Sequence, residues 1–419
     1  MTHVRENLMK HVLFLTYHLP LSNEPGAFRP WMEARLLKRA GFNVTVITSG
    51  VHYMTGEDTR PSKKWCSEEW RDGIRILRTW APSGHRHRAW KRLMNYFSYT
   101  LLSGLAGLIC VKKVNRVLAG TDPLVMMPVV FMLSLIKRAP MVLDERDLFP
   151  ETAIALGVMR EGLLSTLLFQ MQQFFRKKAI GLLAATPGIR AQLITYGCPE
   201  DKVHLLYNAD VFLIEDMQHT NISFGSLKQK LNKQFLVGYS GGLGLANDII
   251  TLLRAMRNLQ DVVELGVVIM GTGERLQSYK EYSLKNGLAN VFFMGAIPRR
   301  EVRPLLQQID VCIHLYPDKD LFDGALASKI FDYLGLGKPI IFCGRGDTAN
   351  LLEITQSGIV VEPENSKELA TAIRKLFTDQ SLRIRMGQAA RKWYEKFIEV
   401  DATCSTLKKA ISDSKPVKI

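Results

Sequence analysis

The stretch FDGALASKIFDYLGLGKPI, residues 322–340, combines a loose entry, a helix and a turn that leads into an apolar strand. Ser328 is predicted to cap a helix that begins at Lys329, which leaves amide donors at the helix start for an anion such as phosphate. Asp332 follows four residues later on the same face, where a carboxylate can accept hydrogen bonds from the vicinal hydroxyls of a ribose. Pro339 ends the helix before the strand. The alternative is an exposed aspartate on an ordinary surface helix.

Apolar runs alternate with helical patterns on both sides of this stretch, as in a doubly wound α/β domain. The first run is HVLFLTY, residues 11–17, and a helix follows with Pro30 in its first turn and Gly41 just past its end. Further runs that we interpret as strands in the first half are NVTVITS, PLVMMPVVF, PMVLDE and GLLAATP. From about residue 235 the same alternation starts again, which predicts two Rossmann-like units.

The predicted domain boundaries follow from this restart. Residues 1–210 form the first unit, the polar residues 211–234 a linker, and residues 235–390 the second unit. A C-terminal helix over residues 391–419 is expected to pack back across both units. The six cysteines are scattered, without the spacing of a disulfide framework or a zinc site, and the N-terminus lacks a signal-peptide pattern. These features favour a cytoplasmic protein without a metal.

The charge is strongly positive, with 55 Lys and Arg against 40 Asp and Glu and a net charge of +15. No acidic residue occurs between Asp72 and Asp122, whereas nine Lys or Arg do. The apolar run over residues 96–111 has 16 residues, too few for a bilayer span of about 20. A helix lying on anionic lipid fits this composition, and a core helix with solvated basic ends is the alternative. The predicted membrane-binding residues are Arg86, Arg88, Lys91 and Arg92.

Two glycine-rich turns follow strands in the second half. The sequence YSGGLG puts Gly242 and Gly244 before a helix, where backbone amides can approach an anion, although many α/β connections contain such a turn. The sequence MGTGERL places Arg275 where its guanidinium could pair with a diphosphate, the alternative being a solvated arginine.

These motifs occur in the order found in retaining family-4 glycosyltransferases. The segments YSGGLG, GTGERL and FDGALASKIFDYLGLGKPI resemble the C-terminal half of that family, which has the GT-B fold. In the N-terminal half, PGAFRPWMEARLLKRAGFNVTVIT and VLDERDLFPETAIALGV are similar to its bacterial surface-polysaccharide branch, of the colanic-acid and O-antigen type, and YNADV stands at its Asn-Gly loop. The resemblance covers nearly the whole chain.

The resemblance implies two Rossmann-like domains that face each other across a cleft, an N-terminal one for the acceptor and a C-terminal one for the donor. It implies transfer of a hexose or aminosugar from a UDP- or GDP-linked donor to a lipid-linked or polysaccharide hydroxyl, with anomeric retention and without a metal or other cofactor. The family's ribose carboxylate corresponds to Asp332, and its diphosphate-binding helix start to residues 327–329.

The chain departs from the family in three places. The family often has a glutamate eight residues before the ribose carboxylate, where this chain has Gly324, so the adjacent Asp323 is a candidate substitute. The ribose carboxylate is an aspartate, one methylene shorter than glutamate. The basic pair that commonly follows the glycine turn is absent, which leaves Arg275 and Lys329 to carry that charge.

On the acceptor side, the resemblance places Gly26 and Arg29 at the loop and helix start that face the cleft, with Arg29 able to reach the donor phosphate. Asp147 follows a predicted strand at its carboxyl end, and we expect it to assist the acceptor hydroxyl. The competing candidates for that role are Glu145, Glu151 and His18. His314 is a further candidate for lining the donor pocket.

Two hypotheses follow. The first is a glycosyltransferase bound peripherally to the inner face of the cell membrane, where it extends a lipid-linked saccharide. The second is a catalytically reduced GT-B-like scaffold subunit of a polysaccharide-assembly complex. Nucleic-acid binding is disfavoured, because the aromatic residues of the basic window lie within an aliphatic run rather than among polar residues as base-stacking platforms.

Overall fold

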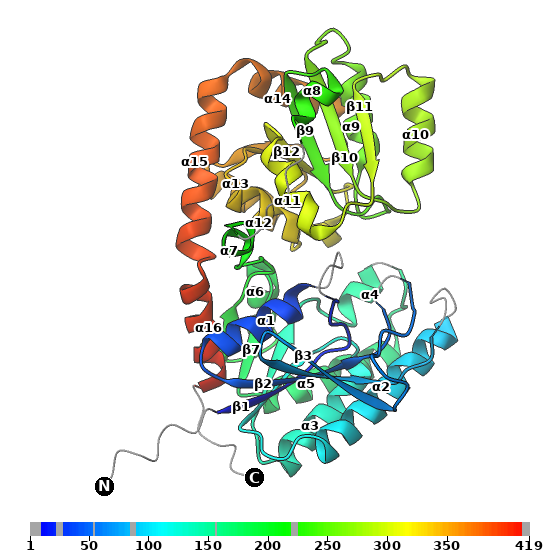
Figure 1. Ribbon diagram of the computed structural model, residues 1–419, viewed down its shortest axis with the longest axis vertical. Helices are drawn as coiled ribbons and strands as arrows, with labels where there is room; N and C mark the ends of the chain where they lie inside the picture. The colour runs from blue at the N-terminus through cyan, green and yellow to red at the C-terminus, as the bar shows by residue number, and fades with distance from the viewer. Residues whose placement is uncertain are drawn as a thin grey trace. The chain divides into compact units, whose positions relative to one another are not determined.

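A computed structural model describes residues 10–21, 28–52, 55–83, 89–155, 157–218 and 225–412. It divides into two compact units, one of residues 1–207 with 400–419 and one of residues 208–399. Each unit is an α/β domain built around a mostly parallel sheet (Figure 1).

The described residues of the first unit form an eight-stranded sheet in the order β3-β4-β2-β1-β5-β6-β7-β8. All neighbouring strands are parallel except β3 and β4, which form an antiparallel pair at one edge. The strands are β1 (His11–Leu15), β2 (Asn43–Ser49), β3 (Cys66–Arg71), β4 (Ile74–Thr79), β5 (Arg116–Gly120), β6 (Met141–Glu145), β7 (Gly181–Ala184) and β8 (Val203–Leu205).

Helices cover both faces of this sheet (Figure 1). α2, α3 and α5 pack on one face, and α1 and α16 on the other. The helices are α1 (Phe28–Arg39), α2 (Ala89–Ile109), α3 (Met127–Ile136), α4 (Glu151–Ala155), α5 (Leu163–Lys178), α6 (Pro187–Thr195) and α16 (Val400–Ser412). The predicted first helix is confirmed as α1, with Pro30 in its first turn and Gly41 at a φ of 87° past its end.

One predicted strand is wrong. The run PLVMMPVVF, residues 123–131, forms a short 3-10 turn and the start of α3, and the strand at this point of the fold is β5. α3 is apolar around most of its circumference, so its sequence lacks the one-sided pattern that distinguishes a surface helix from a buried strand.

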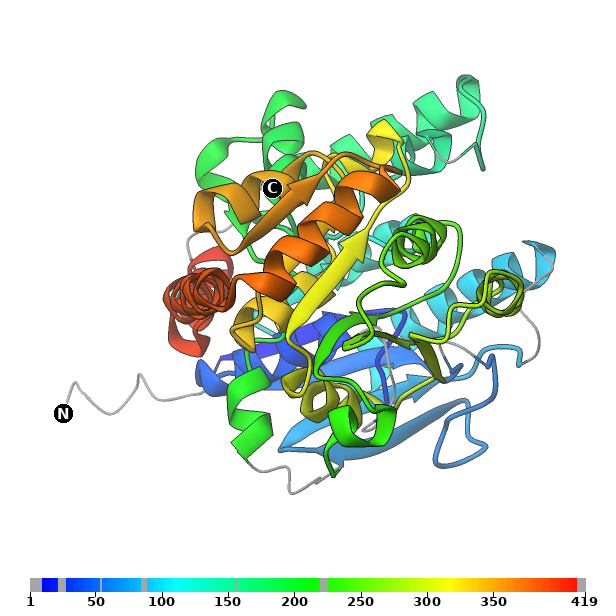
Figure 2. The same ribbon diagram turned by 90° about the horizontal axis from the view of Figure 1, so that it is seen from above.

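The described residues of the second unit form a six-stranded parallel sheet in the order β11-β10-β9-β12-β13-β14. α9, α10 and α14 cover one face, where Figure 2 shows α14 in orange lying across the strands, and α12, α13 and α15 pack on the other. The strands are β9 (Phe235–Ser240), β10 (Leu265–Met270), β11 (Val291–Gly295), β12 (Val311–Leu315), β13 (Ile340–Cys343) and β14 (Gly358–Val361). The helices are α7 (Leu213–Gln218), α8 (Leu227–Leu231), α9 (Ile249–Arg257), α10 (Leu276–Lys285), α11 (Arg299–Gln307), α12 (Ser328–Gly335), α13 (Asp347–Thr355), α14 (Ser366–Thr378) and α15 (Gln380–Phe397).

The observed division differs from the predicted boundaries in two respects. The described part of the expected linker belongs to the second unit, because α7 packs on α12. The expected single C-terminal helix is two helices, and the chain leaves helical geometry at Ile398 and Glu399. α15 belongs to the second unit, whereas α16 packs on α1, β7 and β8 of the first.

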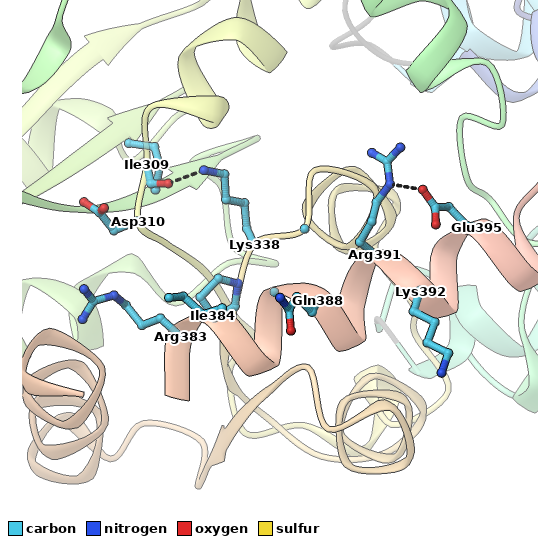
Figure 3. Close-up of a pocket in the computed structure, with 12 residues that line it drawn as sticks. Ile309, Asp310, Lys338, Arg383, Ile384, Gln388, Arg391, Lys392 and Glu395 are labelled. Carbon is cyan, nitrogen blue, oxygen red and sulfur yellow. Dashed lines mark hydrogen bonds and ion pairs between the residues drawn. The ribbon is translucent and has the colours of Figure 1, made fainter. Parts of the chain in front are cut away.

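A groove of about 480 Å³ lies at the amino ends of β12 and β13 (Figure 3). Three cations that line it bind the backbone carbonyls at the C-terminal ends of three helices. Lys338 donates to Gln307 at the end of α11 over 2.6 Å, Arg391 to Gly335 at the end of α12 over 2.6 Å, and Arg383 to Phe377 in the last turn of α14 over 3.0 Å. These contacts compensate carbonyl groups that no intrahelical amide can reach.

Candidate functional site

The turns after β9, β10 and β11 are joined at the carboxyl edge of the second sheet. Gly241 N–H donates to the Met270 carbonyl over 2.9 Å, and Gly271 N–H to the Gly295 carbonyl over 2.7 Å. A Cβ atom on Gly271 would lie 1.8 Å from the Gly241 carbonyl oxygen, so the two turns approach too closely for any side chain there. Gly242 and Gly244 differ, because no atom of their described surroundings lies within 4 Å of a Cβ position. The glycine turn therefore leaves open space on one side.

Lys329 extends from the start of α12 to this glycine turn. Its ammonium donates to the Tyr239 hydroxyl over 3.0 Å and lies 4.3 Å above the Tyr239 ring centre. A Cβ on Gly241 would be 2.4 Å from Lys329 Nζ, so the cation lies directly against the turn. Within the described ranges, its ammonium donates to two neutral oxygens, the second being Asn247 Oδ1 at 3.4 Å. Burial without a counter-charge lowers the pKa of Lys329 to about 7, although the side chain is only partly hidden from solvent. An anion in the open space would compensate this charge.

Ser328 does not cap α12, contrary to the prediction. The chain enters the helix one residue earlier, so Ala327 is the N-cap residue and Ser328 is the first residue of the helix. Alanine has no side-chain acceptor, so the N-cap residue makes no capping hydrogen bond with the amides of this first turn. The helix start therefore keeps its positive end available for a ligand beside Lys329.

Asp332 lies on α12 one turn after Ser328, with its side chain 18% exposed. Arg303 of α11 lies 3.5 Å from it and makes a closer contact with Asp210. Burial raises the pKa of Asp332, and Arg303 opposes this shift. Asp332 thus lies one turn after Lys329 on α12, and its side chain contacts α11 while Lys329 contacts the glycine turn.

The side chains of the remaining donor-side candidates differ in their exposure to solvent. Arg275 is exposed at the start of α10 and lines a cavity of about 310 Å³ that also includes Asn247 and Lys319. Asp323 is about half exposed and 3.9 Å from Arg345. His314 is only 1% exposed, so it does not line an open pocket as predicted. It stacks on Phe342 within the sheet, and burial lowers its pKa well below the ordinary value.

The first unit contains a buried charge cluster that corrects the prediction for Arg29. Arg29 is 2% exposed, donates to Asp144 over 2.7 Å and to the Leu206 carbonyl over 2.7 Å, and lies 3.0 Å from Glu33. It is therefore occupied inside the unit and does not present its guanidinium to a phosphate. The physical reason is that the fully buried Asp144 carboxylate requires a cation, whereas burial and Asp144 raise the pKa of Glu33 to about 8. Sequence analysis missed Asp144, although an acidic residue within a buried strand was a visible signal.

The other acceptor-side candidates differ in whether their side chains are buried within the fold or exposed to solvent. Glu145 is fully buried and pairs with Arg176 over 2.9 Å, which explains it as a structural residue. Glu151 begins α4, and His18 packs edge-on against Tyr17. Asp147 is exposed just beyond β6, and partial desolvation together with the Asp122 carboxylate raises its pKa. Asp147 thus remains the accessible candidate, while Gly26 lies outside the described residues.

Comparison with known proteins assigns both halves of the chain. The family described as "Glycosyl transferases group 1" matches residues 225–393, and "Glycosyl transferase 4-like domain" matches residues 29–209. The chain is a group 1 glycosyltransferase of the GT-B fold. It is 22% identical over 247 residues to the O-antigen chain mannosyltransferase C of Escherichia coli, a region that spans 58% of this chain and 63% of that relative.

Solved structures share the fold of this glycosyltransferase. HepE of Anabaena, solved in complex with UDP, superposes with a TM-score of 0.68 at 15% identity and covers 97% of this chain and 100% of its own. WaaG, a glycosyltransferase involved in lipopolysaccharide biosynthesis, has a TM-score of 0.63 at 15% identity over 96% of this chain and 100% of its own. The resemblance to family-4 enzymes of surface-polysaccharide synthesis is thereby confirmed.

Proposed function

We propose that this glycosyltransferase moves a sugar from a nucleoside diphosphate to a hydroxyl of a lipid-linked or polysaccharide acceptor, with retention, in cell-surface polysaccharide synthesis. The observation that carries the proposal is Lys329, a cation with a lowered pKa held against the open glycine turn beside an uncapped helix start. The names of relatives support the substrate class, since one is an O-antigen mannosyltransferase and one was solved with UDP.

In this proposal the diphosphate lies between Gly242, Gly244 and the first turn of α12. Lys329 and the helix dipole compensate the charge that develops on the leaving diphosphate, so the reaction needs no metal. Asp332 accepts hydrogen bonds from the ribose hydroxyls. The bond from the anomeric carbon to the diphosphate oxygen breaks, a bond to the acceptor oxygen forms on the same face, and the acceptor proton leaves with the diphosphate.

A thermal-shift panel tests the donor site. UDP, GDP, CDP and ADP are added to the wild type, to Asp332→Ala and to Asp261→Ala, a control that removes an exposed carboxylate paired with Arg374 at 2.9 Å. A nucleotide at a hundred times its dissociation constant stabilises the protein by about 2.7 kcal/mol. We expect one nucleotide to stabilise the wild type and the control but to act less on Asp332→Ala. No stabilisation by any of the four favours the scaffold hypothesis.

We further propose that the first unit binds an anionic membrane through α2, α3 and α5. Large hydrophobic side chains are exposed on these three adjacent helices. We call this set of side chains the apolar surface. Its members are Leu93, Met94, Phe97, Leu101, Leu105, Ile109, Met132, Leu135, Ile136, Leu163, Leu164, Leu167 and Phe174. No helix of the described residues has the length and hydropathy to cross a bilayer.

Basic residues at the margin of the apolar surface also support an anionic membrane as its partner. Lys112 and Lys113 follow the end of α2, and Lys177 and Lys178 end α5, all of them exposed. Cations beside exposed apolar groups suit an interface with anionic lipid, each cation near the surface contributing about 1 kcal/mol. Of the four predicted membrane-binding residues, Lys91 lies in α2, Arg86 and Arg88 lie outside the described residues, and nothing is described of the Arg92 side chain.

Vesicle cosedimentation tests the membrane proposal. We expect Leu101→Glu to lose most binding to vesicles that contain phosphatidylglycerol, while Leu284→Glu, at an 85% exposed leucine of the second unit, binds like the wild type. Neutralising Arg86, Arg88, Lys91 and Arg92 together is expected to weaken binding in a salt-dependent way. Unchanged binding in both sets of variants would remove the membrane from the proposed function.

A further inference from the structure

Asp210 is fixed from several sides at the start of the second unit. Its carboxylate pairs with Arg299 over 2.8 Å and with Arg303, two residues four positions apart on one face of α11. Phe212 N–H donates to Asp210 Oδ1 over 3.3 Å, and the Tyr394 hydroxyl donates to the Asp210 carbonyl over 2.6 Å. The carboxylate is nine-tenths buried, so its position is well determined by these contacts.

Arg303 is shared unequally between Asp210 and Asp332. Its Nη2 atom is in hydrogen-bond contact with Asp210 Oδ2, whereas Asp332 Oδ1 lies 3.5 Å from the same atom. Charged hydrogen bonds between guanidinium and carboxylate are normally about 2.7–2.9 Å long, so the pair with Asp332 is a loose one. Because Asp332 keeps 18% of its side chain exposed, its oxygens are not enclosed by this arginine.

We infer that Asp210 is a positioning residue, which holds Arg303 back from Asp332 and thereby keeps the Asp332 carboxylate open to the ribose hydroxyls of a bound nucleotide. The inference rests on the proposed function, since it assumes that Asp332 faces the ribose. A bidentate pair between Arg303 and Asp332 would occupy the lone pairs that the two hydroxyls need. Asp210 competes for Arg303, so the Asp332 carboxyl group keeps acceptor capacity for the hydroxyls of the donor's ribose.

Ribose-dependent binding measures this role. Calorimetry gives dissociation constants for UDP and GDP and for their 2′,3′-dideoxy forms. The dissociation constant of the dideoxy form divided by that of the ribose form reports the contacts of Asp332, and we call this quotient the ratio. For the wild type we expect a ratio of about ten or more, because hydrogen bonds to a carboxylate are lost. In Asp210→Asn, Arg303 is released to Asp332, and the ratio is expected to fall towards one while dideoxy binding stays unchanged.

A double variant and a conservative one separate positioning from stability. Asp210→Asn combined with Arg303→Gln removes the competing cation, and the ratio is expected to recover at pH 8. Asp210→Glu keeps the charge but moves the carboxylate by one methylene, so it carries the test if Asp210→Asn does not fold. The expected result for Asp210→Glu is an intermediate ratio.

The outcomes distinguish the inference from the proposed function. If the wild type binds ribose and dideoxy forms equally, or binds neither UDP nor GDP, the placement of the ribose on Asp332 is wrong and the inference is overturned with it. If the wild type discriminates and the folded Asp210 variants discriminate as strongly, the proposed function stands and the positioning role is refuted.

Discussion

Nucleotide affinity should depend on pH through Lys329. In the free protein its pKa is lowered to about 7, and a bound diphosphate supplies the missing counter-charge and returns the pKa towards the ordinary value of 10.5. Binding above pH 7 therefore takes up a proton. With these two pKa values, linkage predicts that the affinity for the stabilising nucleotide falls about fiftyfold between pH 7 and pH 9.

The stability of the free protein should change in the opposite direction. Because the folded-state pKa of Lys329 lies below the unfolded value, the unfolded chain binds more protons between pH 7 and pH 10.5, and the contribution of this group to stability rises with pH across that window.

Nucleotide binding measured by calorimetry at pH 7, 8 and 9, in buffers of different ionisation enthalpy, separates the proton uptake from the binding heat.

Two variants test whether Lys329 is the responsible group. Lys329→Arg keeps a cation that does not lose its proton in this range, so the fiftyfold dependence should disappear. Lys338→Arg is the matched control, because burial also lowers the pKa of Lys338, but its ammonium is bound to carbonyls at the amino edge of the sheet. An affinity that stays constant from pH 7 to pH 9, or an equal dependence in Lys329→Arg, would refute the reasoning.

Three further substitutions have distinct expected results. Arg29→Met removes one of the two arginines that contact the buried Asp144 and should lower the free energy of unfolding by about 3–5 kcal/mol in urea denaturation, whereas a loss below 1 kcal/mol would contradict the cluster. Asp147→Asn should leave that free energy unchanged but reduce sugar transfer strongly, and equal transfer would exclude it as the group that assists the acceptor. Gly271→Ala places a Cβ 1.8 Å from the Gly241 carbonyl and should both destabilise the protein and weaken nucleotide binding in the same thermal-shift panel.

The sequence predicted the second unit well because its signals are local. The alternation of apolar runs with helices, the glycine turns and the α12 segment each depend on neighbouring residues, and helix periodicity alone puts Asp332 one turn after Ser328. The role expected of Lys329 came from the family resemblance. The exit of α12 was equally visible from Pro339, and the structure adds Gly337, which has a φ of 64°. These features need no knowledge of distant contacts.

The wrong predictions depend on contacts between residues distant in sequence. Arg29 was expected to reach the donor phosphate from the start of a helix, and only the approach of β6 to α1 brings Asp144 against it. Asp210 and Arg303 are 93 positions apart, so no local pattern could connect them. Ser328 is a different case, because helix start positions vary by a residue and a capping residue cannot be assigned from composition alone.

The carbonyl-bound cations in the groove of Figure 3 alter what the net charge of +15 means. Lys338, Arg383 and Arg391 each face the negative end of a helix, which offsets about half an elementary charge per helix. Beside the groove their formal charges are therefore partly offset, whereas the positive ends of the same helices lie elsewhere, so the helices redistribute the charge of the second unit without changing its sum. A polyanion should accordingly be attracted less strongly by this groove than its three cations suggest, while exposed lysines that make no such contact within the described ranges, such as Lys112 and Lys178, keep their full effect.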